Sequence, residues 1–454
     1  MTFLHAPHAL LPDGWAADVR VEIAADGSIA AVAAGQPRQP GDTALDTPLL
    51  PAPTNLHSHT FQRAMAGLTE CAIGGSEDFW SWRRLMYRFL DRMTPADIEA
   101  VAAWAFVEML EGGFAACAEF HYLHHQPGGG SYDDPAETGG RICAAARAAG
   151  IGLTLLPVLY QRAGLDEASV AGGQLRFGCD RDRFVRLLDA TRAHLQADGA
   201  DPISLGVAPH SLRAVAPADV AWAAGLLPDG PVHIHVAEQV AEVAEVTAAL
   251  GRRPVETLLD LGADARWCLI HATHMTDAET AALAASGAVA GLCPVTEANL
   301  GDGVFPAAAF LAAGGRLGIG SDSNICIDVG GELRLLEYGQ RLTRRARAVL
   351  ADDGSVGQAL WMATCRGGAQ AAGRRAGAIA PGLRADLLTL QAAPGVAAMP
   401  PAERLDHAIF AAPRLPVDRL WVAGRRAVEQ GRALARDALR APFERTMAQL
   451  LAAL

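Results

Sequence analysis

Short apolar runs that end in polar residues recur along the central part of the chain. Eight such runs lie at residues 48–59, 114–123, 151–160, 203–211, 231–238, 267–274, 288–297 and 317–324. Runs of this length and character are typical of strands buried on both faces of a parallel sheet. Alanine-rich helical patterns separate several of them. One helix is expected to begin at Thr94, with Pro95 in its first turn, and to end at Gly112.

Eight strands with intervening helices predict an α/β fold, a TIM (β/α)8 barrel over residues 48–375. The two chain ends instead contain short strand-like pieces, the first interrupted by a hairpin turn at Asp26-Gly27. We predict that residues 1–47 and 376–435 form one small β-sandwich-like domain. Residues 436–454 are expected to form a C-terminal helix.

Composition narrows the class of protein. The chain has 454 residues, of which 51% are hydrophobic, so it can bury a large core. The net charge of −12, without a basic block, argues against a nucleic-acid partner. No apolar stretch is long enough to span a membrane without a charge or a breaker, and no signal peptide is evident. We therefore expect a cytoplasmic protein without a membrane partner. We also expect a homodimer, because dimers are the commonest soluble oligomers.

Eight cysteines are scattered along the sequence, and none forms a CxxC pair. We expect them to be small buried side chains in a reduced compartment. The sequence contains no lysine, so all 38 basic residues are arginines. This excludes Schiff-base chemistry on a lysine and a carbamylated lysine bridging two metal ions. A metal site is therefore expected to hold one ion per chain.

Candidate metal ligands end several of the predicted strands. His57 and His59 are two residues apart at the end of the first, so they point to the same side. His235 ends the fifth strand and Asp322 ends the eighth. Three imidazoles and one carboxylate suit Zn²⁺ with one position left for water, and iron or manganese is also possible.

Other polar residues at the same strand ends are candidates for acid–base chemistry. Glu238 comes three residues after His235 and is well placed to move protons at a metal-activated water. His271 ends the sixth strand and is expected to reach the substrate. We expect His233 to be structural and His274 to pack in a loop.

As a set, the HxH, the HxxE, the sixth-strand histidine and the eighth-strand aspartate resemble the motifs of the amidohydrolase superfamily. The missing lysine favours its mononuclear, deaminase-like branch. Within that branch the chain is similar to the formimidoylglutamate deiminase family at residues 55–63, 81–87, 119–125, 209–213 and 293–300. The resemblance implies zinc-dependent conversion of N-formimidoyl-L-glutamate and water to N-formyl-L-glutamate and ammonia, a step of histidine degradation.

The resemblance also implies which residues hold the glutamate part of this small dicarboxylate substrate. They are Gln62, Arg83, Tyr122, His210 and Arg213. Guanidinium groups in fixed places suit a substrate with two carboxylates. Of the adjacent pair Arg83 and Arg84, one is expected to lie on a solvated helix face, and the resemblance favours Arg83 as the substrate ligand.

The expected catalytic residues are Glu238, His271 and Asp322. Asp322 or Glu238 takes a proton from the attacking water, and Glu238 delivers a proton to the nitrogen that leaves as ammonia. His271 hydrogen-bonds the substrate or the developing charge. Two other hypotheses compete with this one. The same metal site can deaminate a purine, pyrimidine or related ring, or the fold can serve as a non-catalytic scaffold.

Overall fold

The computed structural model describes residues 1–70, 79–195 and 203–453, without the side chains of residues 79–84. Both chain ends contribute to one nine-stranded sheet, in the order β18-β17-β16-β15-β5-β1-β2-β3, with β4 paired to β1. Its strands are β1 (Thr2–Leu11), β2 (Gly14–Ile23), β3 (Ile29–Ala33), β4 (Thr43–Ala44), β5 (Leu49–Pro51), β15 (Leu387–Leu390), β16 (Val417–Val422), β17 (Arg425–Glu429) and β18 (Arg432–Ala433). The predicted turn at Asp26-Gly27 joins β2 to β3, which pair antiparallel, and Gly27 has φ +81°. The N-terminal strands thus meet the C-terminal ones through β5, which pairs with both β1 and β15.

The middle of the chain forms parallel strands in two sheets. One contains β6 (Thr54–Ser58), β7 (Ala116–His121), β8 (Gly152–Leu159), β9 (Ser204–Leu205) and β10 (Ala208–Pro209), and the other β11 (Val232–Val236), β12 (Trp267–His271), β13 (Val289–Leu292) and β14 (Arg316–Ile319). Parallel bridges join the sheets at Val207–Val232 and Ser211–His235 on one side, and at Ser58–Asp322 on the other. Every residue of β6, β7, β8, β11, β12 and β13 is buried, as the apolar runs predicted. Because these strands pair in parallel within each sheet and across the bridges, their carboxyl ends lie at one end of the assembly.

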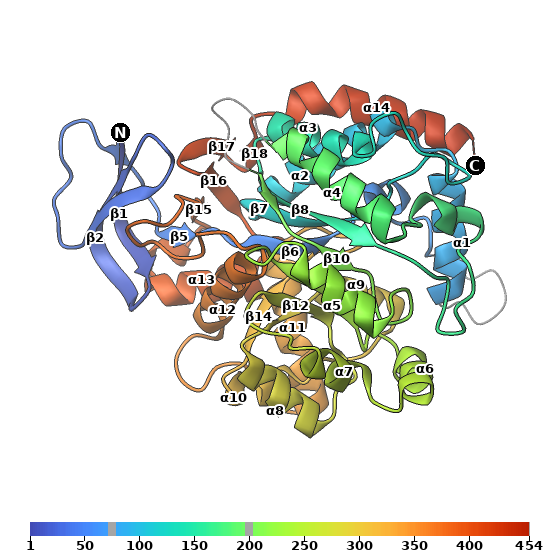
Figure 1. Cartoon of the computed structure of the whole chain (residues 1–454). Coiled ribbons are helices and arrows are strands. Elements are labelled where there is room, and N and C mark those ends of the chain that lie inside the picture. Colours follow the sequence, from blue (N-terminus) through green and yellow to red (C-terminus); the bar gives the residue numbers. More distant parts are fainter. Residues whose placement is uncertain (71–78, 196–202, 454) are drawn as a thin grey trace.

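Helices connect and surround the parallel strands. They are α1 (Phe79–Leu90), α2 (Pro95–Glu111), α3 (Glu137–Ala149), α4 (Arg181–Leu195), α5 (Pro217–Gly225), α6 (Val240–Leu250), α7 (Pro254–Asp260), α8 (Asp277–Ser286), α9 (Pro294–Leu300), α10 (Ala307–Ala312), α11 (Val329–Arg344), α12 (Val356–Ala371), α13 (Pro401–Phe410) and α14 (Arg436–Ala452), with short 3-10 helices η1 (Thr60–Met65), η2 (Gly172–Arg176) and η3 (Val396–Ala398). The predicted start of α2 is confirmed, since Thr94 and Asp97 cap each other's backbone N–H groups. The terminal helix α14 lies along α2 (Figure 1), where the rings of Trp104 and Phe443 stack 5.3 Å apart.

Three expectations from the sequence need correction. The run at 48–59 contains two strands in different sheets, β5 and β6, because Ala52 and Pro53 interrupt the pairing. The run at 288–297 ends as a strand at Leu292, and Pro294 then opens α9. Among the seven cysteines that the structure describes, all are free, but Cys326 is exposed.

Within the described ranges, no helix has the length and apolar character needed to cross a lipid bilayer.

Candidate active site

Four predicted metal ligands converge at the carboxyl ends of the parallel strands. His57 lies in β6, His59 follows it, His235 is the next-to-last residue of β11, and Asp322 follows β14. The Nε2 atoms of His57 and His235 are 3.1 Å apart. Asp322 Oδ1 lies 3.4 Å from His57 Nε2 and 3.3 Å from His59 Nε2. Side chains from strands far apart in sequence therefore bring imidazole nitrogens and a carboxylate oxygen together around His57 Nε2.

Backbone carbonyls orient two of these imidazoles. His59 Nδ1 lies 2.9 Å from the carbonyl oxygen of Phe120, and His235 Nδ1 lies 3.1 Å from that of His210. A carbonyl oxygen only accepts hydrogen bonds, so each Nδ1 carries the hydrogen. The Nε2 atoms then direct lone pairs into the cluster, which is the arrangement of imidazole ligands to a metal ion.

The charge state of the histidines also fits a cation. Burial lowers the pKa of His57 to about 3 and lowers the pKa of His59 and His235 below the ordinary value. All three rings are therefore neutral at pH 7. Neutral nitrogen lone pairs that face each other at 3.1 Å repel, and a divalent ion between them removes that repulsion. Two overlapping sets of donors share His57, one with His59 and Asp322 and one with His235 and His271, so these side chains could hold a metal ion beside His57.

A buried amide network holds the Asp322 loop in place. Asp322 itself has φ +45°, a left-handed conformation that costs energy outside glycine. Asn324 donates 3.0 Å to the carbonyl oxygen of His59, and Ser321 donates 2.6 Å to the Asn324 side chain. Asn55, at the start of the HxH segment, in turn donates to Ser321 Oγ. The sequence motifs contained Asn55 and Asn324, but no pattern showed that they lock the two ligand loops together.

Glu238 and His271 lie beside the cluster without touching each other. Glu238 Oε1 is 3.8 Å from His271 Nε2, which is 3.9 Å from Asp322 Oδ2. Burial alone would lower the pKa of His271, but the surrounding carboxylates, Glu238 first among them, raise it to about 10. The site therefore combines three neutral imidazoles with a fourth that is positively charged.

A cavity of about 750 Å³ opens onto this cluster. Its lining includes Gln62, Tyr122, His210 and Arg213 together with Glu238. Arg213 Nη2 lies 3.7 Å from Glu238 Oε2, and the buried Arg213 Nε has no acceptor among the described residues. A guanidinium in a cavity wall is suited to an anionic ligand.

Of the other predicted substrate-binding residues, Gln62 and His210 have side chains that the structure describes, and Arg83 does not. Gln62 in η1 donates 2.8 Å to the hydroxyl of Tyr122, and the buried Gln62 Oε1 has no donor in the described part of the chain. His210 follows β10 and its Nδ1 lies 3.1 Å from Ser211 Oγ. Arg83 falls in α1, but its side chain lies outside the described residues.

Two other histidines, His233 and His274, contact backbone carbonyl oxygens instead of the ligand cluster. His233 Nε2 lies 2.7 Å from the carbonyl oxygen of Ala371, and His274 Nε2 lies 2.8 Å from that of Asp302. Neither ring belongs to the ligand cluster. Sequence reasoning assigned no role to Glu297, whose carboxylate lies 3.2 Å from His271 Nδ1. Its only signal was its place in the segment 293–300.

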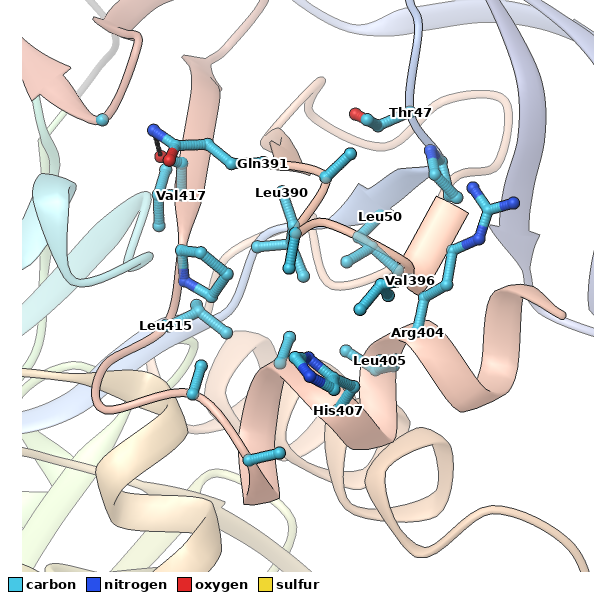
Figure 2. Close-up of a pocket in the computed structure, with 18 of the residues that line it drawn as sticks. Thr47, Leu50, Leu390, Gln391, Val396, Arg404, Leu405, His407, Leu415 and Val417 are labelled. Carbon is cyan, nitrogen blue, oxygen red and sulfur yellow. Dashed lines mark hydrogen bonds between the residues drawn. The ribbon is translucent and has the colours of Figure 1, made fainter. Parts of the chain in front are cut away.

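A second cavity, of about 510 Å³, lies away from the cluster between α13 and the nine-stranded sheet. Figure 2 shows Leu390, Leu405 and Leu415 in its wall, with Arg404 and His407 beside them. Among the described residues, none lines both cavities. The larger cavity is the one lined by His59, His235, Glu238, His271 and Asp322.

Comparison with known proteins agrees with this geometry. Residues 49–427 match the Amidohydrolase family, and the chain belongs to that family. Residues 1–45 match the N-terminal domain of formimidoylglutamate deiminase HutF.

Individual relatives narrow the likeness within the family. The chain is 49% identical to formimidoylglutamate deiminase of Pseudomonas aeruginosa, over 99% of this chain and 100% of that protein. It is 27% identical to 5-methylthioadenosine/S-adenosylhomocysteine deaminase of Natronomonas pharaonis, over 95% of this chain and 94% of that one. The crystal structure of an amidohydrolase from Brucella melitensis superposes with a TM-score of 0.94 at 49% identity, over 99% of this chain and 100% of that chain.

Proposed function

We propose that this protein is a formimidoylglutamate deiminase, which hydrolyses N-formimidoyl-L-glutamate to N-formyl-L-glutamate and ammonia. The observation that carries the proposal is the 49% identity to the Pseudomonas aeruginosa enzyme along the whole chain. The match of residues 1–45 to the N-terminal domain of such deiminases adds to it. The enzyme is thus a hydrolase acting on a non-peptide C–N bond, and histidine degradation is its proposed setting.

The proposed cofactor is one Zn²⁺ per chain, held by His57, His59, His235 and Asp322. The converging Nε2 lone pairs and the carboxylate oxygen support this set, and iron or manganese would suit the same donors. When bound, such an ion lowers the pKa of water from about 15.7 toward 7 and so supplies a nucleophile at neutral pH. The absence of lysine supports a mononuclear site.

The proposed acid–base residues are Glu238, His271 and Asp322. Asp322 or Glu238 accepts the proton of the attacking water, and Glu238 delivers a proton to the nitrogen that leaves as ammonia. His271 Nε2 faces the same space as Glu238, at 3.8 Å, and is placed to hydrogen-bond the reacting group. The formimidoyl carbon gains the water oxygen, loses its imino nitrogen as ammonia and stays bonded to the glutamate nitrogen. The reaction is a hydrolysis and needs no oxidant.

The proposed substrate contacts are Arg213, Gln62, Tyr122, His210 and Arg83. Arg213 supports a carboxylate contact because its buried Nε lacks an acceptor among the described residues. Gln62 and Tyr122, joined by a hydrogen bond in the cavity wall, offer further polar contacts for the glutamate part. Arg83 keeps its role on the resemblance alone.

The proposed architecture is a (β/α)8 barrel over residues 48–375, a small β-sandwich-like domain from residues 1–47 and 376–435, and a C-terminal helix over 436–454. The bridges that join the two parallel sheets support the barrel, and the pairing of β5 with strands from both chain ends supports the small domain. We also propose a cytoplasmic homodimer. Free cysteines support a reducing compartment, and dimers are the commonest assemblies.

A ring deaminase is the second candidate. The 27% identity to the Natronomonas pharaonis protein favours it, as do Tyr160 and Phe177 in the cavity wall, which can stack on a ring. An ammonia-release assay separates the two candidates. Zinc-loaded protein is incubated with N-formimidoyl-L-glutamate, S-adenosylhomocysteine, adenosine, guanine or cytosine. We expect turnover of N-formimidoyl-L-glutamate only. Turnover of a ring substrate alone would establish the second candidate, and a protein that binds no metal and releases no ammonia would be a scaffold.

A further inference from the structure

Glu297 contacts the candidate active site from behind His271. It lies on α9 and is only 4% exposed. Its Oε1 accepts a hydrogen bond from the backbone N–H of Cys293 at 2.8 Å, and lies 3.2 Å from His271 Nδ1. A carboxylate oxygen only accepts hydrogen bonds, so Nδ1 of His271 donates to it.

Fixing one nitrogen of an imidazole sets the direction of the other. His271 is 1% exposed and has φ +68°, so its backbone adopts a conformation that is unfavourable for a non-glycine residue. Its far nitrogen, Nε2, faces Glu238 Oε1 at 3.8 Å and Asp322 Oδ2 at 3.9 Å. The ring therefore spans from the Glu297 carboxylate to the space where the reacting group would lie.

We infer that Glu297 is a positioning residue for the deimination proposed above, on which this inference rests. Its carboxylate accepts the hydrogen bond from His271 Nδ1, whether the ring is neutral or charged, and holds the ring so that Nε2 points at the reacting group. Hydrogen-bond partners of this kind fix both the tautomer and the orientation of functional histidines, and their loss typically costs about 10- to 100-fold in activity or metal affinity.

The same side chains could instead form a second metal site, and the experiments must distinguish the two possibilities. His271, Cys293 and Glu297 lie close enough together to hold a metal ion of their own. Such an ion would take the Nδ1 lone pair of His271, so Nδ1 would carry no hydrogen. The protonation of Nδ1 and the metal content therefore distinguish a positioning carboxylate from a second metal site.

The chain offers a matched control in Glu332. Its side chain is fully buried, and its Oε2 accepts the backbone N–H of Val295 at 2.9 Å, also at the start of α9. No hydrogen bond joins it to His271 among the described residues. Glu332→Leu and Glu297→Leu each remove a buried carboxylate that satisfies one N–H of the same helix start, and only Glu297→Leu also frees His271.

The first experiment compares kcat and KM for N-formimidoyl-L-glutamate in zinc-loaded variants. We expect Glu297→Leu to lower kcat about 10- to 100-fold with KM changed less than about threefold. Glu297→Gln, whose amide oxygen can accept the same two hydrogen bonds, should recover most of kcat, and Glu332→Leu should stay within about threefold of the unmodified protein. Equal losses in the two leucine variants, or no recovery in Glu297→Gln, would overturn the inference.

The second experiment does not depend on turnover. ¹⁵N NMR of metal-free protein with labelled histidines, in which His271→Asn identifies the His271 signals, reports the hydrogen on Nδ1 directly. We expect a protonated Nδ1 in the unmodified protein. An unprotonated Nδ1, or a second equivalent of zinc that disappears in Glu297→Gln, would overturn the inference. Failure of the proposed function would show separately, as no ammonia from the unmodified enzyme.

Discussion

Glu238→Gln tests the proposed proton carrier. Glutamine has the same shape as glutamate, so the distances of 3.8 Å to His271 and 3.7 Å to Arg213 should persist. The four ligand residues are not altered, so the protein should bind zinc as before. The substitution removes the ability to take up and deliver a proton, together with the negative charge that faces His271 and Arg213.

The size of the effect follows from that loss. A positioned general acid–base group contributes about 10²- to 10⁴-fold to the rate, which is about 2.7–5.4 kcal/mol in the barrier. We expect kcat to fall by this factor and KM to change by less than about threefold, because Arg213, which lines the cavity, is retained.

The assay is steady-state ammonia release with zinc content measured on the same samples. Glu403→Gln is a suitable control, because Glu403 is exposed on α13, away from the active-site cavity; its kcat should stay within about threefold. The reasoning is refuted if Glu238→Gln with a full zinc complement keeps more than about a tenth of the normal kcat.

Three further predictions concern substrate, metal and pH. Arg213→Ala should lower kcat/KM for N-formimidoyl-L-glutamate about 10- to 100-fold, since a hydrogen bond to a charged group contributes about 1.5–3 kcal/mol; an equal loss for the uncharged diamide analogue, measured by the same assay, would contradict a carboxylate contact. Dialysis against a chelator should abolish ammonia release and lower Tm in calorimetry, and added Zn²⁺ should restore both; a chelated protein with unchanged Tm and activity would argue against a bound ion. Burial raises the pKa of Glu119 from 4.5 to about 7, so the folded state binds more protons than the unfolded state between these values. The free energy of unfolding should then fall by up to about 3 kcal/mol as pH rises from about 4.5 to above 7, and Glu119→Gln should flatten this slope in urea titrations; an identical slope in the variant would count against it.

The candidate ligands could be predicted because each follows an apolar run. His235 lies in β11 and Asp322 follows β14. These strands run parallel, so their carboxyl ends had to meet at one end of the sheets whatever the lengths of the helices between them. The alternation of side chains along a strand also placed His57 and His59 on one side. These features depend on local pattern and on strand direction, which the sequence carries.

Other features depend on tertiary contacts and left no local signal. The left-handed backbone at His271 and Asp322 occurs at residues other than glycine, where sequence gives no warning. The carbonyl that orients His59 belongs to Phe120, on the neighbouring strand β7. Segment boundaries were missed where proline was given too little weight, as at Pro53 and Pro294.

Anomalous diffraction at the zinc edge, from crystals of the zinc-loaded protein, tests the central claim most directly. The account predicts one anomalous peak per chain, within bonding distance of His57 Nε2, His59 Nε2, His235 Nε2 and an oxygen of Asp322. A peak bonded to other residues, two peaks in one chain, or a fully loaded crystal with no peak among these four side chains would contradict it.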